Sequence, residues 1–216
     1  MKVGFIIKKF KKILSTVSAG VLCAIPMVNG VAANAASESG RINTYKVYCD
    51  ISKNSGIKRA TLVIDYNDMD IAQSKIKGNL GGTLTDANVT TPDYEEFGIL
   101  FESSTVLMNP GTLFAAKFTT NHDFNSCLVR MQAEGFDKSL SLIKPSPITV
   151  DVVLMGDVNN DGVVNIMDVI NINRYLMDVE NVSINLRAAD VNDDGIVTKE
   201  DSDMVLNYTV QNIEHF

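Results

Sequence analysis

The 216-residue chain contains no tryptophan. Proteins that recognise sugars rely on flat, amphipathic aromatic rings that stack against the apolar faces of the sugar. The absence of the largest such ring therefore weighs against a carbohydrate-binding role. Among the six tyrosines, the following remain candidates for a sugar platform: Tyr45, Tyr48, Tyr66 and Tyr94.

The motifs of hydrolytic enzymes are also absent. No Ser or Cys lies in a nucleophile motif, and we interpret His122, in the stretch TTNHDFN, as a turn residue. Glycoside hydrolysis usually needs two carboxyl groups whose surroundings push their pKa values apart. We interpret the acidic residues near the expected strand ends as solvated loop charges: Asp65, Asp68, Asp70, Glu95, Glu96 and Glu102. The sequence therefore predicts no catalytic residue and a protein that is not an enzyme.

The first 35 residues have the pattern of a secretory signal peptide. A basic run ending at Lys12 precedes an apolar stretch from Ile13 to Val28, and Ala33-Asn34-Ala35 supplies a small-x-small cleavage signal. The apolar stretch contains Pro26 and is shorter than the roughly 20 residues that a membrane-spanning helix needs. We therefore expect a secreted protein whose mature form has no membrane segment.

Cysteine is scarce once this leader is removed. Cys49 and Cys127 remain, each in a stretch where apolar residues alternate. Both are therefore expected to face one core, either as a disulfide or as two buried thiols, and the sequence leaves both alternatives open.

Basic residues are rare in the C-terminal part of the chain. Residues 151–216 contain 13 acidic and 3 basic residues, whereas residues 37–150 contain 13 acidic and 11 basic ones. Nucleic acid is excluded as a partner, because a phosphate backbone needs a basic face. A merely solvated acidic tail would lack the regularly spaced apolar residues that lie among these carboxylates. The carboxylates are instead expected to bind a cation.

An internal repeat indicates which cation. The stretch DVNNDGVVNIMD begins at Asp157 and recurs 33 residues later, at Asp190, as DVNDDGIVTKED. Both copies fit the calcium-loop pattern D-x-[DN]-x-[DN]-G-x5-E with a final Asp, and Gly162 and Gly195 make the turn at the sixth position. The alternative is a pair of Asx turns that cap helices without metal, but crowded carboxylates would then repel one another.

Calcium takes six to eight oxygen ligands in a flexible geometry, so the repeat predicts two calcium ions. The first loop offers Asp157, Asn159, Asp161, the carbonyl of Val163, Asn165 directly or through water, and Asp168 as a bidentate ligand. The second loop offers Asp190, Asn192, Asp194, the carbonyl of Ile196, Thr198 and Asp201.

A helical pattern follows each loop. Apolar residues recur at helical spacing from Val169, at Val169, Ile170, Leu176 and Met177 with Asn173 between them, and again at Met204, Val205 and Tyr208. A short helix is predicted over residues 184–189, whereas the stretch before the first loop, ITVDVVLMG, is typical of a strand and linker. This tandem of loop and exit helix resembles the type I-like dockerin module of cellulosome proteins over residues 156–210, within an expected domain at 156–216.

The dockerin resemblance implies a calcium-folded module that binds a cohesin on a scaffolding protein of a polysaccharide-degrading complex. It also implies contacts at the tenth and eleventh loop positions and in the helix that follows. These residues are Ile166 and Met167 in the first repeat, Lys199 and Glu200 in the second, and Arg174. The best-known dockerins carry similar small hydroxyl pairs in both repeats, so the different pairs here favour a single interface on the apolar first repeat. The alternative is that Ile166 and Met167 pack inside the module.

Residues 41–152 show short alternating runs separated by Gly, Asn, Pro and Ser, which predicts a β-sandwich of jelly-roll type. The runs are TYKVYCDI, RATLVIDY, FGILFES, GTLFAAKFTT, CLVRMQA and PITVDVVL. Their order and spacing are similar to the cohesin fold, which shares its sandwich with several carbohydrate-binding modules. This resemblance implies a non-catalytic adaptor whose sandwich binds a further dockerin. The alternatives are a polysaccharide-binding module and a small glycoside-active enzyme.

Overall fold

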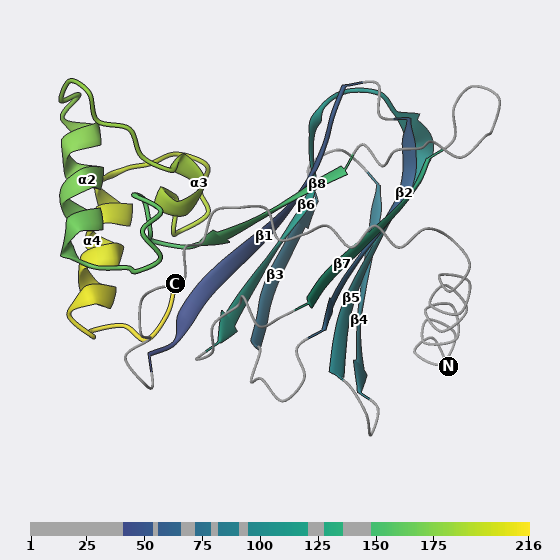
Figure 1. The fold of residues 1–216 in the computed structure, drawn as a ribbon, viewed down its shortest axis with the longest axis horizontal. Coiled ribbons are helices and arrows are strands. Elements are labelled where there is room, and N and C mark those ends of the chain that lie inside the picture. The colour runs from purple at the N-terminus through teal and green to yellow at the C-terminus, as the bar shows by residue number, and fades with distance from the viewer. Residues whose placement is uncertain are drawn as a thin grey trace.

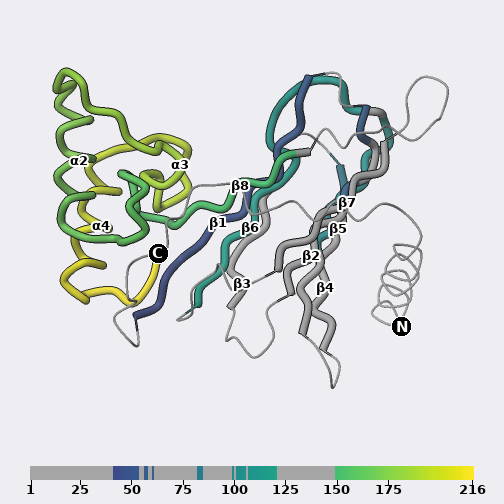
Figure 2. Tube along the Cα trace, in the orientation of Figure 1, coloured from purple at the N-terminus to yellow at the C-terminus, as the bar shows by residue number. Residues whose placement is uncertain are grey.

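The computed structural model describes residues 41–53, 56–65, 72–78, 82–90, 95–120, 128–135 and 148–216, which Figure 2 shows in colour where placement is certain. The expected signal peptide, Cys127, Tyr66, Tyr94 and His122 lie outside these residues. In the described part of the chain, no helix is both long and apolar enough to cross a membrane.

The described residues up to 154 form two antiparallel four-stranded sheets, which we call the β-domain (Figure 1). One sheet has the order β3-β6-β1-β8 and the other the order β4-β5-β2-β7. The strands are β1 (Asn43–Ile51), β2 (Ile57–Asp65), β3 (Ala72–Gly78), β4 (Thr83–Thr90), β5 (Glu95–Leu107), β6 (Gly111–Thr120), β7 (Leu128–Gly135) and β8 (Ile148–Leu154). The pairs β1·β8, β2·β7, β3·β6 and β4·β5 join the first strand with the last and continue inward, as in a folded long hairpin.

Each of the six apolar runs recognised in the sequence contains a strand among its described residues, whereas β3 and β4 were not predicted. Their sequences, AQSKIKG and TLTDANVT, contain few large apolar residues and lack a clear alternation. Both strands lie at the edge of their sheet. A strand in this position depends on its neighbour for hydrogen bonds and can form without a strong apolar pattern of its own.

Strand β1 is buried on both faces, which indicates that another part of the chain packs on its outer side. Its inward residues, including Val47 and the fully buried Cys49, join one hydrophobic cluster with residues of both sheets, such as Phe101 and Phe114. Successive side chains of a strand point to opposite faces, yet the outward Lys46 is also buried. A second domain therefore covers part of the outer face of this sheet, at β1, β6 and β8.

That second domain contains α2 (Ile166–Leu176), α3 (Leu186–Ala189) and α4 (Lys199–Thr209). In Figure 1 it lies beside β1 and β8, with the C-terminus close to the sheet. Helices α2 and α4 pack against each other. Their buried side chains include Val169 and Ile172 of α2 and Val205 of α4. The predicted short helix is present, beginning two residues later than expected.

The expected apolar face of α2 was only partly right. Val169 is buried, but Ile170, Leu176 and Met177 are exposed, and Ile172 is buried in their place. Helix α2 has α4 on one side and no described element on the other (Figure 1). The additional apolar residues therefore remain on the surface of the domain.

Candidate metal centre and docking surface

The first loop is held closed by carboxylates that accept hydrogen bonds from its own backbone. The two oxygens of Asp157 accept from the backbone N–H groups of Asp161 and Gly162, at 3.1 and 2.9 Å. Asp168 lies at the far end of the loop and accepts from Val158 at 3.0 Å. These bonds bring the first and last predicted ligands of the loop into one compact turn.

The second loop repeats this network bond for bond. Asp190 accepts hydrogen bonds from the backbone of Asp194 and Gly195, both at 3.1 Å. Asp201 accepts from Val191 at 3.0 Å. The repeat seen in the sequence is therefore a repeat of side-chain geometry.

The sixth-position glycines adopt the backbone conformation expected from the sequence. Gly162 has a φ of 89° and Gly195 a φ of 92°, values that side-chain-bearing residues rarely adopt. The fourth position is also left-handed, at Asn160 (φ 56°) and Asp193 (φ 64°). Asn and Asp are the residues that tolerate this region best after glycine.

The end of each loop is also the start of a helix. Asn165 and Thr198 are the N-caps of α2 and α4, and Asp168 and Asp201 complete capping boxes at the third helical position. The capping turns of the metal-free alternative are thus present. They do not exclude a metal at the first loop, because Asp168 accepts three backbone hydrogen bonds and an ionised carboxylate has about four lone-pair sites. Asp201 accepts three backbone hydrogen bonds and a longer one from the Thr198 hydroxyl, at 3.3 Å.

Several of these carboxylates are removed from water. Asp157 is 4% exposed, and Asp168 and Asp201 are 0% exposed. Burial raises the pKa of Asp168 to about 6, against the opposing effect of the backbone hydrogen bond from Asn165. Burial likewise raises the pKa of Asp157 above its usual value. Among the ion pairs of the described residues, none involves these three carboxylates.

A buried carboxylate without a counter-charge is unfavourable, so the loops fit a bound cation. Among the described residues, no group of three or more His, Cys, Asp and Glu side chains lies close enough to hold a metal. The predicted ligand sets also use Asn, Thr and backbone oxygens. In the first loop, Asn159 donates to Asp161 at 2.8 Å and Asn165 lies 3.4 Å from the carbonyl of Val163. The twelve ligands named from the sequence stay a prediction.

The predicted docking residues lie on the surface. Ile166 is 52% and Met167 50% exposed, which excludes the alternative that they pack inside the module. Arg174 is also exposed, on the same helix. In the second repeat Lys199 and Glu200 are exposed as well, and Lys199 pairs with Asp203 at 2.5 Å. The tenth and eleventh positions therefore present an apolar surface in one repeat and a charged surface in the other.

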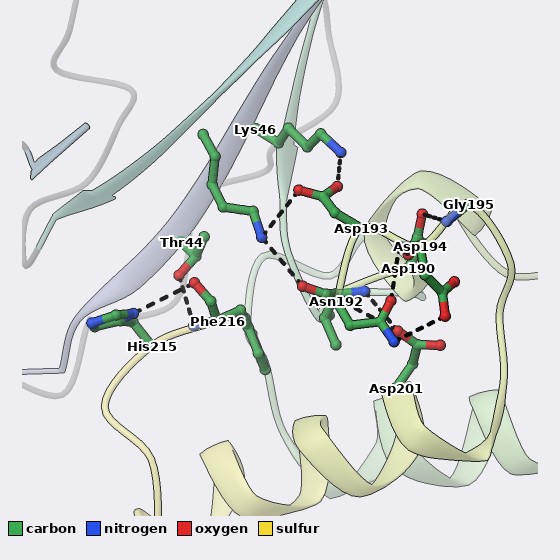
Figure 3. Close-up of polar contacts among 12 residues, drawn as sticks. Thr44, Lys46, Asp190, Asn192, Asp193, Asp194, Gly195, Asp201, His215 and Phe216 are labelled. Atoms are coloured by element: carbon green, nitrogen blue, oxygen red, sulfur yellow. Dashed lines mark hydrogen bonds and ion pairs between the residues drawn. The ribbon is translucent and has the colours of Figure 1, made fainter. Parts of the chain in front are cut away.

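The contact that the second loop makes with the β-domain was not predicted from the sequence. Asp193 pairs with Lys46 of β1 and, at 3.4 Å, with Lys117 of β6. Figure 3 shows Lys46 and Asp193 pointing toward each other, beside Asn192 and Asp194 of the loop. Burial lowers the pKa of the Lys46 ammonium, but the hydrogen bond and charge of Asp193, together with Tyr48, outweigh it and raise the pKa. The only sequence signal was the change from Asn160 to Asp193 between the repeats.

The described tyrosines of the β-domain do not form an open sugar platform. Tyr45 is buried in the core. The guanidinium of Arg187 lies 4.3 Å from the ring centre of Tyr48 and covers one face of it. Of the residues considered for acid-base chemistry, the side chains of Asp65, Asp68, Asp70, Glu95 and Glu96 lie outside the described part of the structure.

Comparison with known families decides the nature of the C-terminal domain. Residues 155–209 match the family model of the dockerin type I domain. A dockerin domain is present. This confirms the resemblance drawn from the two loops and their exit helices. The match covers only this part of the chain, and no curated protein and no solved structure matches the chain. The family of the β-domain stays a prediction.

Proposed function

We propose that the chain is a secreted, non-catalytic assembly protein. Its dockerin domain binds two calcium ions and docks to a cohesin module of a scaffolding protein in a cellulosome-type, polysaccharide-degrading complex. The observation that carries this proposal is the exposed apolar surface of α2, which begins directly after a calcium-type loop in a domain of the dockerin family.

Calcium supplies positive charge to loops that are rich in buried carboxylate. The predicted ligands of the first loop are Asp157, Asn159, Asp161, Val163, Asn165 and Asp168, and the second loop repeats them 33 residues later. Asp168 and Asp201 also complete the capping boxes at the start of α2 and α4. An ion bound at these carboxylates would therefore hold the start of each helix, and with it the docking surface, in place.

The first repeat offers the better surface for a protein partner. Ile166, Met167 and Ile170 are exposed large apolar residues near the start of α2. The residues 33 positions later are Lys199, Glu200 and Asp203. Apolar side chains that leave water at an interface each contribute on the order of 1–3 kcal/mol, whereas exposed charges at a rim contribute little. The cohesin therefore binds the first repeat, and Arg174 adds a polar contact.

The β-domain is the second functional part of this adaptor. Its strand pairs join first with last, second with seventh, third with sixth and fourth with fifth. This pairing supports the jelly-roll prediction, since a long antiparallel hairpin rolled into two layers gives the same pairs. A cohesin-like domain of this kind would bind a further dockerin. Polysaccharide binding is the second candidate, but the buried Tyr45 and the covered Tyr48 weaken it.

Partner affinity measured by calorimetry in calcium tests the docking proposal. The double variant Ile166→Asp/Met167→Asp is compared with the double variant Lys199→Ala/Glu200→Ala. The partner is a cohesin module that the wild-type chain binds. We expect the first variant to lose tenfold or more in affinity and the second to stay close to wild type. Equal helical circular dichroism establishes that both variants fold. A larger loss in the second variant would assign the interface to the second repeat.

A further inference from the structure

Two residues of the second repeat contact the β-domain, whereas their counterparts in the first repeat lie on the surface. Asp193 corresponds to Asn160, 33 residues earlier, and Tyr208 corresponds to Tyr175. Asn160 is exposed and accepts a hydrogen bond from within the dockerin domain, from Asn185 at 2.9 Å. Tyr175 is exposed, whereas Tyr208 is buried. The duplicated halves therefore differ in what they contact.

Asp193 is the centre of the contact between the domains. Its side chain is 7% exposed, and the side chains of its partners Lys46 and Lys117 are 10% and 9% exposed. The ammonium of Lys117 also donates to the carbonyl of Val191, in the same loop, at 3.2 Å. Two strands of one sheet are thus fastened to the second loop by buried charge-assisted bonds, which are stronger than neutral ones.

A second group of contacts lies at α3. Arg187 pairs with Asp50 of β1 and Asp151 of β8, both at 2.8 Å, and covers the ring of Tyr48. These bonds hold α3, which leads directly into the second loop, against the same sheet.

A third group lies at the end of α4. The hydroxyl of Tyr208 donates to the carbonyl of Ile42 at 2.9 Å, and Arg41 lies over its ring at 4.2 Å while donating to its carbonyl at 2.8 Å. The second repeat is therefore attached to the β-domain at its loop, at the helix before the loop and at the helix after it.

We propose that the second calcium loop is the joint between the two domains, and that the outer face of β1, β6 and β8 is its docking surface. This inference rests on the calcium binding of the proposed function. Asp193 lies between the predicted ligands Asn192 and Asp194 in a left-handed backbone conformation, so the order of the loop determines where its carboxylate points. Because coupling between two binding events is reciprocal, the β-domain in turn strengthens calcium binding at the second loop.

Simple charge repulsion predicts the opposite effect, which makes the proposal testable. Lys46 and Lys117 bring two positive charges to the edge of a cation-binding loop. If they acted only through their charge, removing one would strengthen calcium binding, since like charges repel. If they hold the loop in its calcium-binding form, removing one weakens calcium binding.

The experiment measures calcium affinity by calorimetry in the mature full chain with Lys46→Met. In a chain whose first loop is silenced by Asp157→Ala, we expect Lys46→Met to weaken calcium binding threefold or more. In the matched chain whose second loop is silenced by Asp190→Ala, the same substitution should leave the affinity unchanged. Unchanged or tighter binding at the second loop would overturn the inference. A wild-type chain that binds no calcium would refute the proposed function as well.

A second measurement avoids the silenced loops. Small-angle X-ray scattering in saturating calcium compares Asp193→Asn, which keeps a residue suited to the left-handed conformation, with Asn160→Ala in the first loop. We expect a larger radius of gyration for Asp193→Asn and a wild-type value for Asn160→Ala. Wild-type values for both variants would show that Asp193 does not join the domains.

Discussion

The ring of Phe216 lies directly over the backbone of Gly156, at the junction between β8 and the first loop. A β-carbon on Gly156 would stand 3.0 Å from ring atoms Cε2 and Cζ of Phe216 and 2.9 Å from Cγ1 of Val164. The backbone N–H of Gly156 also donates to the carbonyl of Ala188 at 2.8 Å. The junction is therefore closely packed and leaves no space for a side chain.

Two glycine substitutions distinguish the cost of overpacking this junction from the cost of backbone strain. Gly156 and Gly195 have similar φ values of 88° and 92°, but a β-carbon on Gly195 would meet nothing within 4 Å. We expect Gly195→Ala to cost about 1–2 kcal/mol through backbone strain alone. Gly156→Ala should cost about 1–3 kcal/mol more because it also overpacks the junction. Denaturant unfolding in saturating calcium checks this order, and equal costs would contradict it.

The dockerin part of the chain was predictable from the sequence because its signals are local. The twelve-residue ligand pattern, the sixth-position Gly162 and Gly195, and the helical periodicity all lie within short windows, and the structure places loops and helices there. The face of α2 was less predictable. Apolar residues lie on two faces of this helix. Its packing against α4 determines that Ile172 is buried and Ile170 exposed, and the helix sequence alone does not specify this.

The contact between the domains could not be predicted, because it depends on residues far apart in the chain. Lys46 and Asp193 are separated by 147 positions, and a lysine in an alternating strand normally indicates a solvent-facing side. Likewise β3 and β4 depend on hydrogen bonds to β6 and β5, which no pattern within their own sequences specifies. Tertiary context decided each of these features.

Removal of calcium should unfold the dockerin domain. Three carboxylates per loop are predicted ligands, including the buried Asp168 and Asp201, and a domain of this size is marginal without metal or disulfides. In residues 36–216 we expect excess chelator to abolish most of the helical circular dichroism, and millimolar calcium to restore it. The β-domain contributes little helical signal and serves as the internal reference. An unchanged helical signal in chelator would show that the loops fold without metal.

Mild acid should stabilise the calcium-free dockerin domain, whereas acid usually destabilises a folded protein. Burial raises the pKa of Asp168 to about 6 in the folded state, above the ordinary value of about 3.9 for an unfolded chain. Between these values the folded state binds more protons than the unfolded state, so stability contributed by this group falls as pH rises from about 4 to 6. In chelator, we therefore expect the helical circular dichroism that is lost at pH 7 to return in part at pH 4.5, where Asp168 is protonated in the folded state.

Two measurements check this pH prediction. The variant Asp168→Asn has no proton to lose, so its helical circular dichroism in chelator should vary less with pH over the same range. Calcium binding needs the ionised carboxylate, so the calcium affinity of the wild-type chain should weaken as pH falls below about 6. An identical pH profile for wild type and Asp168→Asn would show that another group is responsible.

The equivalent tyrosines of the two repeats provide a matched test of the attachment at α4. The hydroxyl of Tyr208 donates to the carbonyl of Ile42 at 2.9 Å and lies 3.0 Å from Oδ1 of Asn43, whereas Tyr175 is exposed. We expect Tyr208→Phe to lower the free energy of unfolding by about 1 kcal/mol, because the part-buried carbonyl of Ile42 loses its donor. Tyr175→Phe, the same chemical change at a surface position, should stay within about 0.5 kcal/mol of wild type. Denaturant unfolding of the full chain in calcium measures both values. If both variants unfold like wild type, the hydroxyl of Tyr208 contributes nothing to the attachment. This end of α4 would then be held by the contacts of the Tyr208 ring with Arg41, at 4.2 Å, and with the ring of Phe216, whose centre lies 4.7 Å away.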